Sequence, residues 1–218
     1  MNTTGTAIDA RVRALVRDSA EWRLLGRLFE CPSNVWHTDL ASLARELDDT
    51  SLRAAAEHAR TEATEGLFHS VFGPGGPAPP REVSYHDSLE LGTLMSALTG
   101  CYDAFGYEPA TIETLDHVAV EVGFVAYLRL KEAYALTTGD QERAAMTRRA
   151  AARFVTEHLS MMAEALATLL AGSGIEYLAH ASTLLAARVG PKPKSKLLPV
   201  LQPDPMDDES GSEFPCDV

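Results

Sequence analysis

The chain has 218 residues, of which 45 % are hydrophobic, 23 % are charged and 7 % are aromatic. This length and composition exclude a short peptide and a wholly disordered chain, and they are typical of a globular protein with a large buried core. Thirty-one acidic residues against nineteen basic ones give a formal net charge of −12, which opposes binding to nucleic acid or to an anionic membrane surface.

The amino-terminal segment and the cysteines bear on the compartment in which the protein works. The first twenty residues mix arginine with aspartate and contain no uninterrupted apolar segment for a secretory signal. No later segment is apolar over the thickness of a bilayer. Cys31, Cys101 and Cys216 are far apart and odd in number, so a disulfide framework is not indicated. We therefore predict a cytoplasmic protein without stable membrane insertion.

The spacing of apolar residues is helical along almost the whole chain, and no alternating strands joined by a hairpin turn are found. We predict an all-α fold of about seven or more helices. The first helix should begin near Thr6, where Thr6 and Asp9 resemble a capping box, and end at Pro32. Its apolar positions are Ile8, Val12, Leu15, Trp22, Leu25 and Phe29. Two further helices are predicted at 35–47 and 51–72.

The segment 73–80, GPGGPAPP, cannot continue a helix, because its prolines lack the amide donor and its glycines lose much entropy on ordering. The clearest helix follows, with an apolar stripe at Leu91, Leu94, Met95, Leu98, Cys101, Tyr102 and Phe105. A second break at 106–111 is interpreted as a hinge before a helix at 115–136.

The last part of the chain contains further helix signals. Gly139 and Asp140 indicate a helix end followed by an N-cap, and the next helix should end near Gly172. Its inward face is predicted at Val155, Leu159, Met162, Leu166 and Leu169. Ser173 and Glu176 resemble a capping box for a last helix, with Leu178, Ala181 and Leu185 facing inward as far as Gly190.

These elements predict one helical domain over residues 1–190. Its amino-terminal helical group, 6–72, is joined by the loop 73–84 to a carboxy-terminal group, 85–190. Residues 191–218 are rich in proline, serine and acidic residues, so a flexible tail is predicted there.

Signatures of the common enzyme classes are missing, including the phosphate-binding loop, the serine-hydrolase elbow and the zinc-protease motif. The nearest approaches to metal-ligand spacing are Glu65-x-x-x-His69, Glu113-x-x-x-His117 and His117-x-x-x-Glu121. None of them matches the Glu-x-x-His pattern of a di-iron helical bundle. The three cysteines have no obvious activating neighbour. We predict no metal site, no resident cofactor and no catalytic residue.

One group of residues remains, at the start of the helix after the second break. At 100° per residue, His117, Glu121 and Phe124 share one helix face with Leu128. In one interpretation, Asp116 is an acidic residue favoured at a helix N-terminus, and His117 with Glu121 is an ordinary i, i+4 pair. In the other, these side chains form a binding site. The residues alone leave both interpretations open.

Several short motifs occur in a characteristic order. They are the segment 22–32 (WRLLGRLFECP), the segment 82–85 (EVSY) after the proline-rich loop, the segment 102–107 (YDAFGY), the pair Asp116-His117 with Glu121, Phe124 and Leu128, and Phe154 with His158. Over about residues 20–170 this pattern resembles the TorD/DmsD/NarJ family of redox-enzyme maturation chaperones. The family commonly has Glu-Pro-x-Asp-His where this chain has Glu-Thr-Leu-Asp-His at 113–117, which suggests a divergent branch with its own client.

The resemblance implies a non-enzymatic chaperone in the cytoplasm. Its client would be the twin-arginine signal peptide, or the apo form, of a molybdopterin-containing catalytic subunit, and cofactor insertion would precede export. The implied client-binding residues are Asp116, His117, Glu121, Phe124, Tyr85, Tyr102 and Tyr107. Asp116 and Glu121 are the first candidates to pair with the arginines of the peptide.

Two alternatives stay open at this point. One is a helical enzyme or cofactor carrier that uses His117, Glu121 and Tyr85 on a small molecule, with a weak interaction with a guanine nucleotide or the molybdenum cofactor. The other is a helical adaptor with no signal-peptide role. A DNA-binding adaptor is disfavoured, because the best basic cluster, Arg143, Arg148, Arg149 and Arg153, is interpreted as a solvated helix face. A hinge is compatible with a monomer and with a domain-swapped dimer.

Overall fold

The computed structural model describes residues 3–192, and side chains from Ile8 onward. Every regular element in this range is helical, and the one β-type pairing within it is an isolated antiparallel bridge between Arg81 and His117. The all-α prediction is therefore confirmed for the described residues. No helix among them is long and apolar enough to cross a membrane. The predicted tail lies outside them from residue 193 onward.

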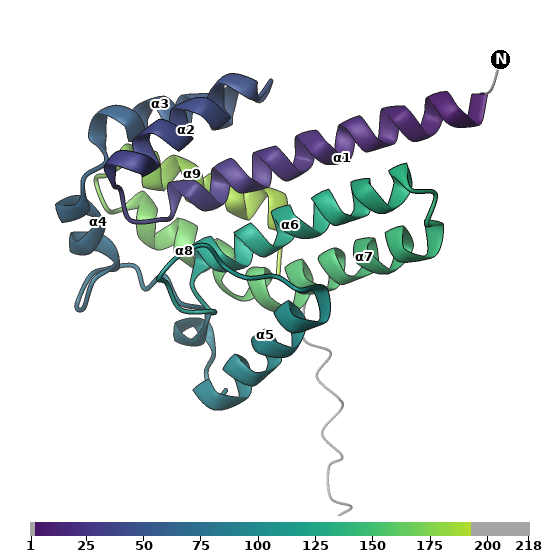
Figure 1. The fold of residues 1–218 in the computed structure, drawn as a ribbon. Helices are drawn as coiled ribbons and strands as arrows, with labels where there is room; N and C mark the ends of the chain where they lie inside the picture. Colours follow the sequence, from purple (N-terminus) through teal and green to yellow (C-terminus); the bar gives the residue numbers. More distant parts are fainter. Residues whose placement is uncertain (1–2, 193–218) are drawn as a thin grey trace, which may run out of the picture.

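Most of the helices follow one another with short connections, but 18 residues separate α4 from α5 and 12 separate α5 from α6 (Figure 1). They are α1 (Thr3–Leu28), α2 (Asn34–Glu46), α3 (Thr50–Glu62), α4 (Glu65–Phe72), α5 (Leu91–Phe105), α6 (Val118–Thr137), α7 (Gln141–Phe154), α8 (Ser160–Ala171) and α9 (Glu176–Val189). A 3₁₀ turn occupies Glu82–Tyr85, and a π-helical turn at Val155–Leu159 joins α7 to α8.

The longest helix, α1, lies along α6, and the two share the centre of the core (Figure 1). Trp22, Leu25 and Phe29 are buried, as the apolar spacing predicts. Gly26 of α1 lies against the α6 backbone, where an added Cβ would come within 3.3 Å of the carbonyl oxygen of Ala119. A glycine at this crossing therefore lets the two helices approach closely.

The amino-terminal half of α1 reaches beyond this core. It begins at Thr3 rather than near Thr6, so the predicted capping box does not mark its start. Ile8, Val12 and Leu15 are partly buried and pack on a small separate cluster formed by Ala135, Leu136 and Ala144. The apolar stripe of α1 therefore packs against two hydrophobic clusters, one near each end of α6.

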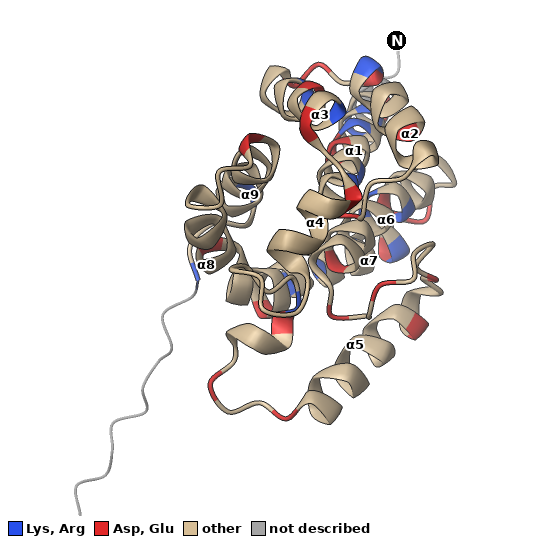
Figure 2. Ribbon diagram, turned by 90° about the vertical axis from the view of Figure 1, so that its left-hand side faces the viewer, with Lys and Arg blue, Asp and Glu red and all other residues tan. Residues whose placement is uncertain are grey.

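The helix α5 lies at the margin of the molecule (Figures 1 and 2). It carries a single charged residue, Asp103, close to its carboxyl end. Leu94, Leu98 and Tyr102 are buried, whereas Leu91 is 45 % exposed. The predicted stripe is therefore buried at its centre but not at its start, because Leu91 is the first residue of the helix and lies at its outer end.

The predicted helix 51–72 is wrong, because it is divided into α3 and α4. The backbone of Ala63 is extended, with φ −70° and ψ 127°, and this ends α3. The Thr64 side chain then accepts a hydrogen bond from the amide of Leu67 and caps α4. Threonine is a favourable N-cap residue, and this local hydrogen bond outweighs continuation of the helix.

The predicted capping box of Ser173 and Glu176 is also wrong. Glu176 is the first residue of α9, and the Ser173 hydroxyl accepts from the amide of Ile175 instead. The cap comes from α3, where the carboxylate of Glu62 accepts from the amides of Glu176 and Tyr177, each at 3.1 Å. A side chain distant in sequence thus satisfies the exposed amides of this helix start.

The region 139–172 agrees with the prediction at its start and differs later. Gly139 has φ +77°, and Asp140 caps α7 by accepting from the amide of Arg143. The single predicted helix is divided by the π-helical turn, and in α8 Leu169 is 39 % exposed while Leu170 is buried. In α8, which packs on α9, Leu170 therefore faces the core in place of the predicted Leu169.

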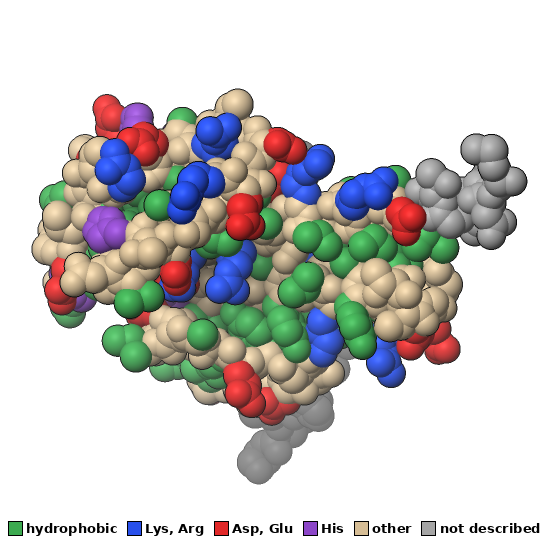
Figure 3. Space-filling model, turned by 45° about the horizontal axis from the view of Figure 1, so that its top comes forward, with side chains coloured by type: hydrophobic (Ala, Val, Ile, Leu, Met, Phe, Trp, Pro, Cys, Tyr) green, Lys and Arg blue, Asp and Glu red, His purple; other side chains and the backbone are tan. Residues whose placement is uncertain are grey.

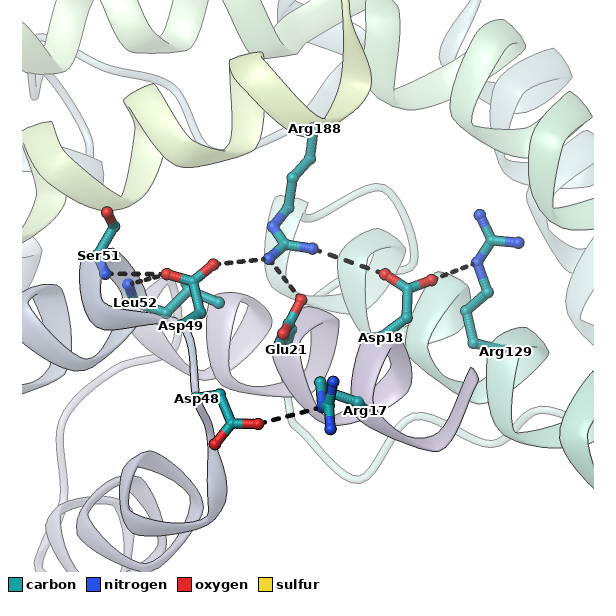
Figure 4. Close-up of polar contacts among 9 residues, drawn as sticks. All are labelled: Arg17, Asp18, Glu21, Asp48, Asp49, Ser51, Leu52, Arg129 and Arg188. Carbon is teal, nitrogen blue, oxygen red and sulfur yellow. Dashed lines mark hydrogen bonds and ion pairs between the residues drawn. The ribbon is translucent and has the colours of Figure 1, made fainter. Parts of the chain in front are cut away.

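Ion pairs link helices from the two ends of the chain (Figure 4). The guanidinium of Arg188 in α9 lies 2.7 Å from the Glu21 carboxylate of α1, 3.2 Å from that of Asp49 and 3.6 Å from that of Asp18. Asp18 also pairs with Arg129 of α6 at 2.9 Å. These side chains are 16–34 % exposed, and together we call them the Arg188 network. The network joins α1, α6 and α9 to the start of α3.

Candidate functional site

Charged and polar side chains meet inside the protein where the 3₁₀ turn lies against the start of α6. Glu82, Asp116 and Glu121 have no exposed surface, His117 is 2 % exposed and His158 is 8 % exposed. We call this set, together with its neighbours Arg81 and His86, the buried polar cluster. Buried charges of this kind are stable only when they are paired, hydrogen-bonded or neutralised.

Two stretches of backbone, 35 residues apart, hold the cluster together. The amide of Glu82 donates to the carbonyl oxygen of Asp116, and the amide of Val118 donates to that of Pro80, both at 2.8 Å. Nε of Arg81 donates to the two carboxylate oxygens of Asp116 at 2.9 and 3.1 Å. The charge of Asp116 is therefore already compensated by a residue of the proline-rich connection.

The helix start differs from the prediction. His117, not Asp116, is the N-cap of α6, and its Nδ1 accepts from the amide of Ala119 at 3.2 Å. Burial lowers the pKa of His117 to about 4, which gives the neutral ring that this acceptor role requires. Its Nε2 lies 3.8 Å from Glu113, and neither carboxyl oxygen of Glu121 has a hydrogen-bond partner among the described residues. The expected His117–Glu121 pair is therefore not formed.

The carboxylate of Glu82 is the centre of the cluster. One oxygen contacts Nε2 of His86 at 2.8 Å, and the other contacts Nδ1 of His158 at 3.0 Å. Burial by itself would raise the pKa of Glu82, but the hydrogen bonds from His158 and His86 outweigh it and lower that pKa. Glu82 is therefore ionised, and both contacting ring nitrogens carry protons. The 3₁₀ turn is tied in this way to the π-helical turn before α8.

The protonation state of Glu121 differs from that of Glu82, although both lie in the same cluster. Burial and the neighbouring charge of Glu82 raise its pKa well above the ordinary value. Two adjacent buried carboxyl groups cannot both be ionised at low cost, so one of them holds a proton. Here Glu82 is the carboxylate and Glu121 is the neutral acid.

An aromatic cluster covers the next turns of α6. The rings of Tyr102, Phe124 and Phe154 lie with centroids 4.8–6.1 Å apart, and Tyr102 donates to the carbonyl oxygen of Leu115 at 2.9 Å. Tyr107 contacts both Tyr102 and Phe124. Its hydroxyl lies where a Cβ on Gly123 would come within 2.6 Å, so this ring depends on a glycine in α6.

Of the predicted site residues, five lie in the interior, namely Asp116, His117, Glu121, Phe124 and Tyr102. Tyr85 and Tyr107 are partly buried. The Tyr85 hydroxyl donates to the carbonyl oxygen of Pro79 at 2.6 Å, and the Tyr107 hydroxyl donates to that of Val120 at 3.3 Å. Burial raises the pKa of both tyrosines to about 12, so both hydroxyls are neutral donors. The structure therefore brings most of the set together, but away from solvent.

A groove of about 590 Å³ lies beside this interior set, between α1, the segment 106–111 and α6. Tyr107 is the one predicted site residue that lines it. The charged side chains at the groove are Arg23, Arg27, Glu30 and Glu108, none of which sequence reasoning selected. The sequence feature that could have indicated this groove is the pair of glycines Gly26 and Gly123, which lie where α1 and α6 approach closely.

An apolar hollow of about 440 Å³ adjoins this groove. It is lined mainly by Val12, Val16, Leu130 and Tyr134, and Leu130 also lines the groove itself. Val16, Leu130 and Tyr134 are 46 %, 50 % and 66 % exposed. Figure 3 shows hydrophobic side chains gathered beside α1 on the half nearer the N-terminus. We call this hollow the apolar strip.

Within the buried polar cluster, His86 and His158 both contact the carboxylate of Glu82, whereas His117 accepts from a backbone amide, so the three rings do not form a common metal site. Within residues 8–192, a single group of three metal-ligating side chains has its donor atoms close together, and it consists of Cys31, Glu65 and His69. This group lies outside the site predicted from the sequence.

Comparison with known proteins adds one finding. The model of a protein family described as the nitrate reductase delta subunit matches residues 34–168, which is more than half of the chain. The matched range contains the seven predicted site residues, the buried polar cluster and the segment 106–111. No individual curated protein matches the chain.

Proposed function

Because the chain belongs to the nitrate reductase delta subunit family, which comprises non-catalytic maturation chaperones of the NarJ/TorD type, we propose that it binds the signal peptide of a molybdoenzyme. The peptide is the amino-terminal segment of the apo form of a molybdopterin-containing catalytic subunit. Binding takes place in the cytoplasm and holds the subunit back from twin-arginine export until the cofactor is inserted.

The observation that carries this proposal is that a charged groove adjoins an apolar strip at Leu130. A twin-arginine signal peptide has a charged end followed by an apolar stretch. A surface that offers carboxylates at one end and apolar side chains at the other fits both parts of such a peptide at once. The half-exposed Leu130 is then the point where the two parts of the peptide meet.

The charges in the groove favour one orientation of the peptide. Glu108 is exposed and forms no ion pair with another described residue. Arg27 is already held by Glu30 and Asp39. The arginines of the peptide therefore bind near Glu108, on the side of the segment 106–111, while Arg23 repels them from α1.

In this proposal the buried residues position the groove rather than contact the peptide arginines. Asp116 is engaged by Arg81, and Glu121 is a neutral acid in the interior. The contact between Arg81 and Asp116 holds the start of α6, which is one wall of the groove. Phe124 and Tyr102 support Tyr107, and the ring of Tyr107 contributes to the wall.

Calorimetric titration with a synthetic peptide tests the proposal. The peptide has two adjacent arginines followed by an apolar stretch, and a second peptide has glutamines in place of the arginines. Leu130→Ser should weaken binding about tenfold, because a leucine side chain loses its apolar contact with the peptide. Glu108→Gln should weaken it about fivefold at low salt and less at high salt.

Two substitutions at comparable positions away from the groove serve as controls. Val35→Ser removes an apolar side chain that is 67 % exposed on α2, and Glu142→Gln removes an exposed carboxylate on α7. Both should bind the peptide as tightly as the wild type does. Failure of the wild type to bind the peptide would refute the proposed function, whereas equal binding by Leu130→Ser would refute only its location.

A further inference from the structure

A cysteine, a glutamate and a histidine meet on the surface between the end of α1 and α4. Cys31 lies in the connection after α1 and is partly buried, while Glu65 and His69 are exposed on α4. One donor atom from each side chain, sulfur, oxygen and nitrogen, lies within 4.8 Å of the other two. We propose that these three residues bind a divalent transition-metal ion of the zinc type.

The fold brings the three donors together in a simple way. Glu65 and His69 are four residues apart in one helix, so their side chains lie on the same face. The helix α1 ends at Leu28, and Cys31 lies in the irregular segment that follows it, beside α4. Because 34 residues separate Cys31 from Glu65, no local spacing motif contains all three ligands.

The donor atoms are close enough to share one ion without being locked together by a direct hydrogen bond. Nε2 of His69 and Oε1 of Glu65 are 3.7 Å apart, which is too long for a hydrogen bond. Two ligand atoms in a tetrahedral zinc site are separated by roughly 3.3–3.7 Å, since each lies about 2.0–2.3 Å from the metal. The side chains of His69 and Glu65 are 58 % and 74 % exposed, so they are free to rotate toward a shared ion.

The donor types and the local charge select the class of ion. Thiolate and imidazole are ligands of zinc and related transition metals, whereas magnesium and calcium prefer oxygen donors alone. The carboxylate of Glu65 supplies a negative charge beside the cysteine and the histidine. On binding, the thiol proton passes to solvent and a sulfur–metal bond forms. Three protein ligands leave the fourth position to water.

The full-length chain, freed of metal with a chelator, is titrated with Co²⁺ and then with Zn²⁺. We expect one Co²⁺ per chain, a thiolate-to-cobalt charge-transfer absorption and displacement by Zn²⁺ but not by Mg²⁺. Cys31→Ser should abolish the absorption. Glu65→Gln and His69→Gln should each weaken Co²⁺ binding roughly tenfold or more, since even residues outside the ligand set affect metal affinity by this amount.

Matched substitutions separate this site from adventitious binding. Cys101→Ser, Cys216→Ser and His58→Gln should leave both the absorption and the affinity unchanged. Circular dichroism and melting of the metal-free proteins check that each variant is folded, and His69→Gln decides the question if Cys31→Ser does not fold. A wild-type protein without the absorption, absorption that persists in folded Cys31→Ser, or wild-type affinity in His69→Gln would each overturn the proposal.

Discussion

The Arg188 network and the buried polar cluster use the same kinds of side chain to join distant parts of the chain, but they differ in their access to water. In the network, Arg188, Glu21 and Asp49 are 16–27 % exposed. In the cluster, the carboxyl groups of Glu82 and Asp116 have no exposed surface. The first set remains partly solvated, whereas the second depends wholly on its partners.

This difference determines what each contact contributes to folding. A partly exposed ion pair contributes little, because water and salt screen it and its side chains lose entropy. A buried charge that loses its partner is much more costly, because nothing replaces the lost solvation. The buried polar cluster should therefore dominate the response of stability to mutation and pH, although the network contains four ion pairs and the cluster only three charged contacts.

The largest effect is expected from Glu82→Ala. This change removes the shared acceptor of His86 and His158 and leaves both rings without their partner in the interior. The free energy of unfolding should fall by about 3–5 kcal/mol, as for other broken buried pairs. Urea unfolding followed by circular dichroism measures it.

The exposed carboxylate of Glu57, which pairs with Arg60 on the surface of α3, is the control for this substitution. Glu57→Ala should leave the free energy of unfolding almost unchanged, because water and salt screen this exposed pair. If the two substitutions had equal effects, burial would not be the property that separates the two regions.

A smaller effect, confined to acid conditions, is expected from His117. Its pKa is about 4 in the folded protein and about 6.5 in an unfolded chain, so the unfolded state binds more protons between these values. The wild type therefore loses stability as pH falls from 6.5 to 4, by up to about 1.4 kcal/mol per pH unit. Because asparagine also serves as an N-cap, His117→Asn should keep the start of α6 and flatten this decline.

Unfolding curves at several pH values between 7 and 4 measure the slope. His58→Asn replaces a half-exposed histidine and should leave the slope as in the wild type. The Arg188 network contains no histidine, so Arg188→Ala should also leave it unchanged. A decline that is as steep in His117→Asn as in the wild type would show that this buried ring does not cause it.

The smallest effect of the three is expected in the Arg188 network. Arg188→Ala removes contacts to Glu21, Asp49 and Asp18, and should lower the free energy of unfolding by about 1 kcal/mol, less at high salt. Arg17→Ala, which breaks the exposed pair with Asp48, should have almost no effect. Thermal melts at low and high salt measure both variants. A loss in Arg188→Ala as large as that in Glu82→Ala would contradict the comparison.

The helices were predictable where one face is apolar and the end signals are local. The buried residues Trp22, Leu25 and Phe29 follow from spacing, and Asp140 caps α7 as its position after Gly139 indicates. The predictions failed where a helix end depends on a local capping hydrogen bond that competes with continuation of the helix, or on a side chain distant in the sequence. Thr64 starts a new helix within an otherwise helical pattern, and Glu62 of α3 caps α9.

The sequence selected a set of interior residues but not their contacts, and among the residues that line the groove it selected Tyr107 alone. Helical spacing placed His117 and Glu121 on one face, and both are buried at the start of α6, but their side chains do not pair. The groups that act on them come from elsewhere, since Arg81 binds Asp116, and burial together with the charge of Glu82 raises the pKa of Glu121. Spacing along one helix carries no information about residues that a preceding loop brings against it.

The sequence by itself therefore determined the helical class, the helices with strong apolar stripes and the resemblance to a chaperone family. These properties depend on periodicity and on short motifs, which are local. Only the tertiary structure decided that Asp116 is paired and buried, that Leu130 joins a charged groove to an apolar strip, and that Cys31 lies beside Glu65 and His69. Burial, protonation state and ligand geometry depend on atoms that are close in space, and chain order does not specify which atoms those are.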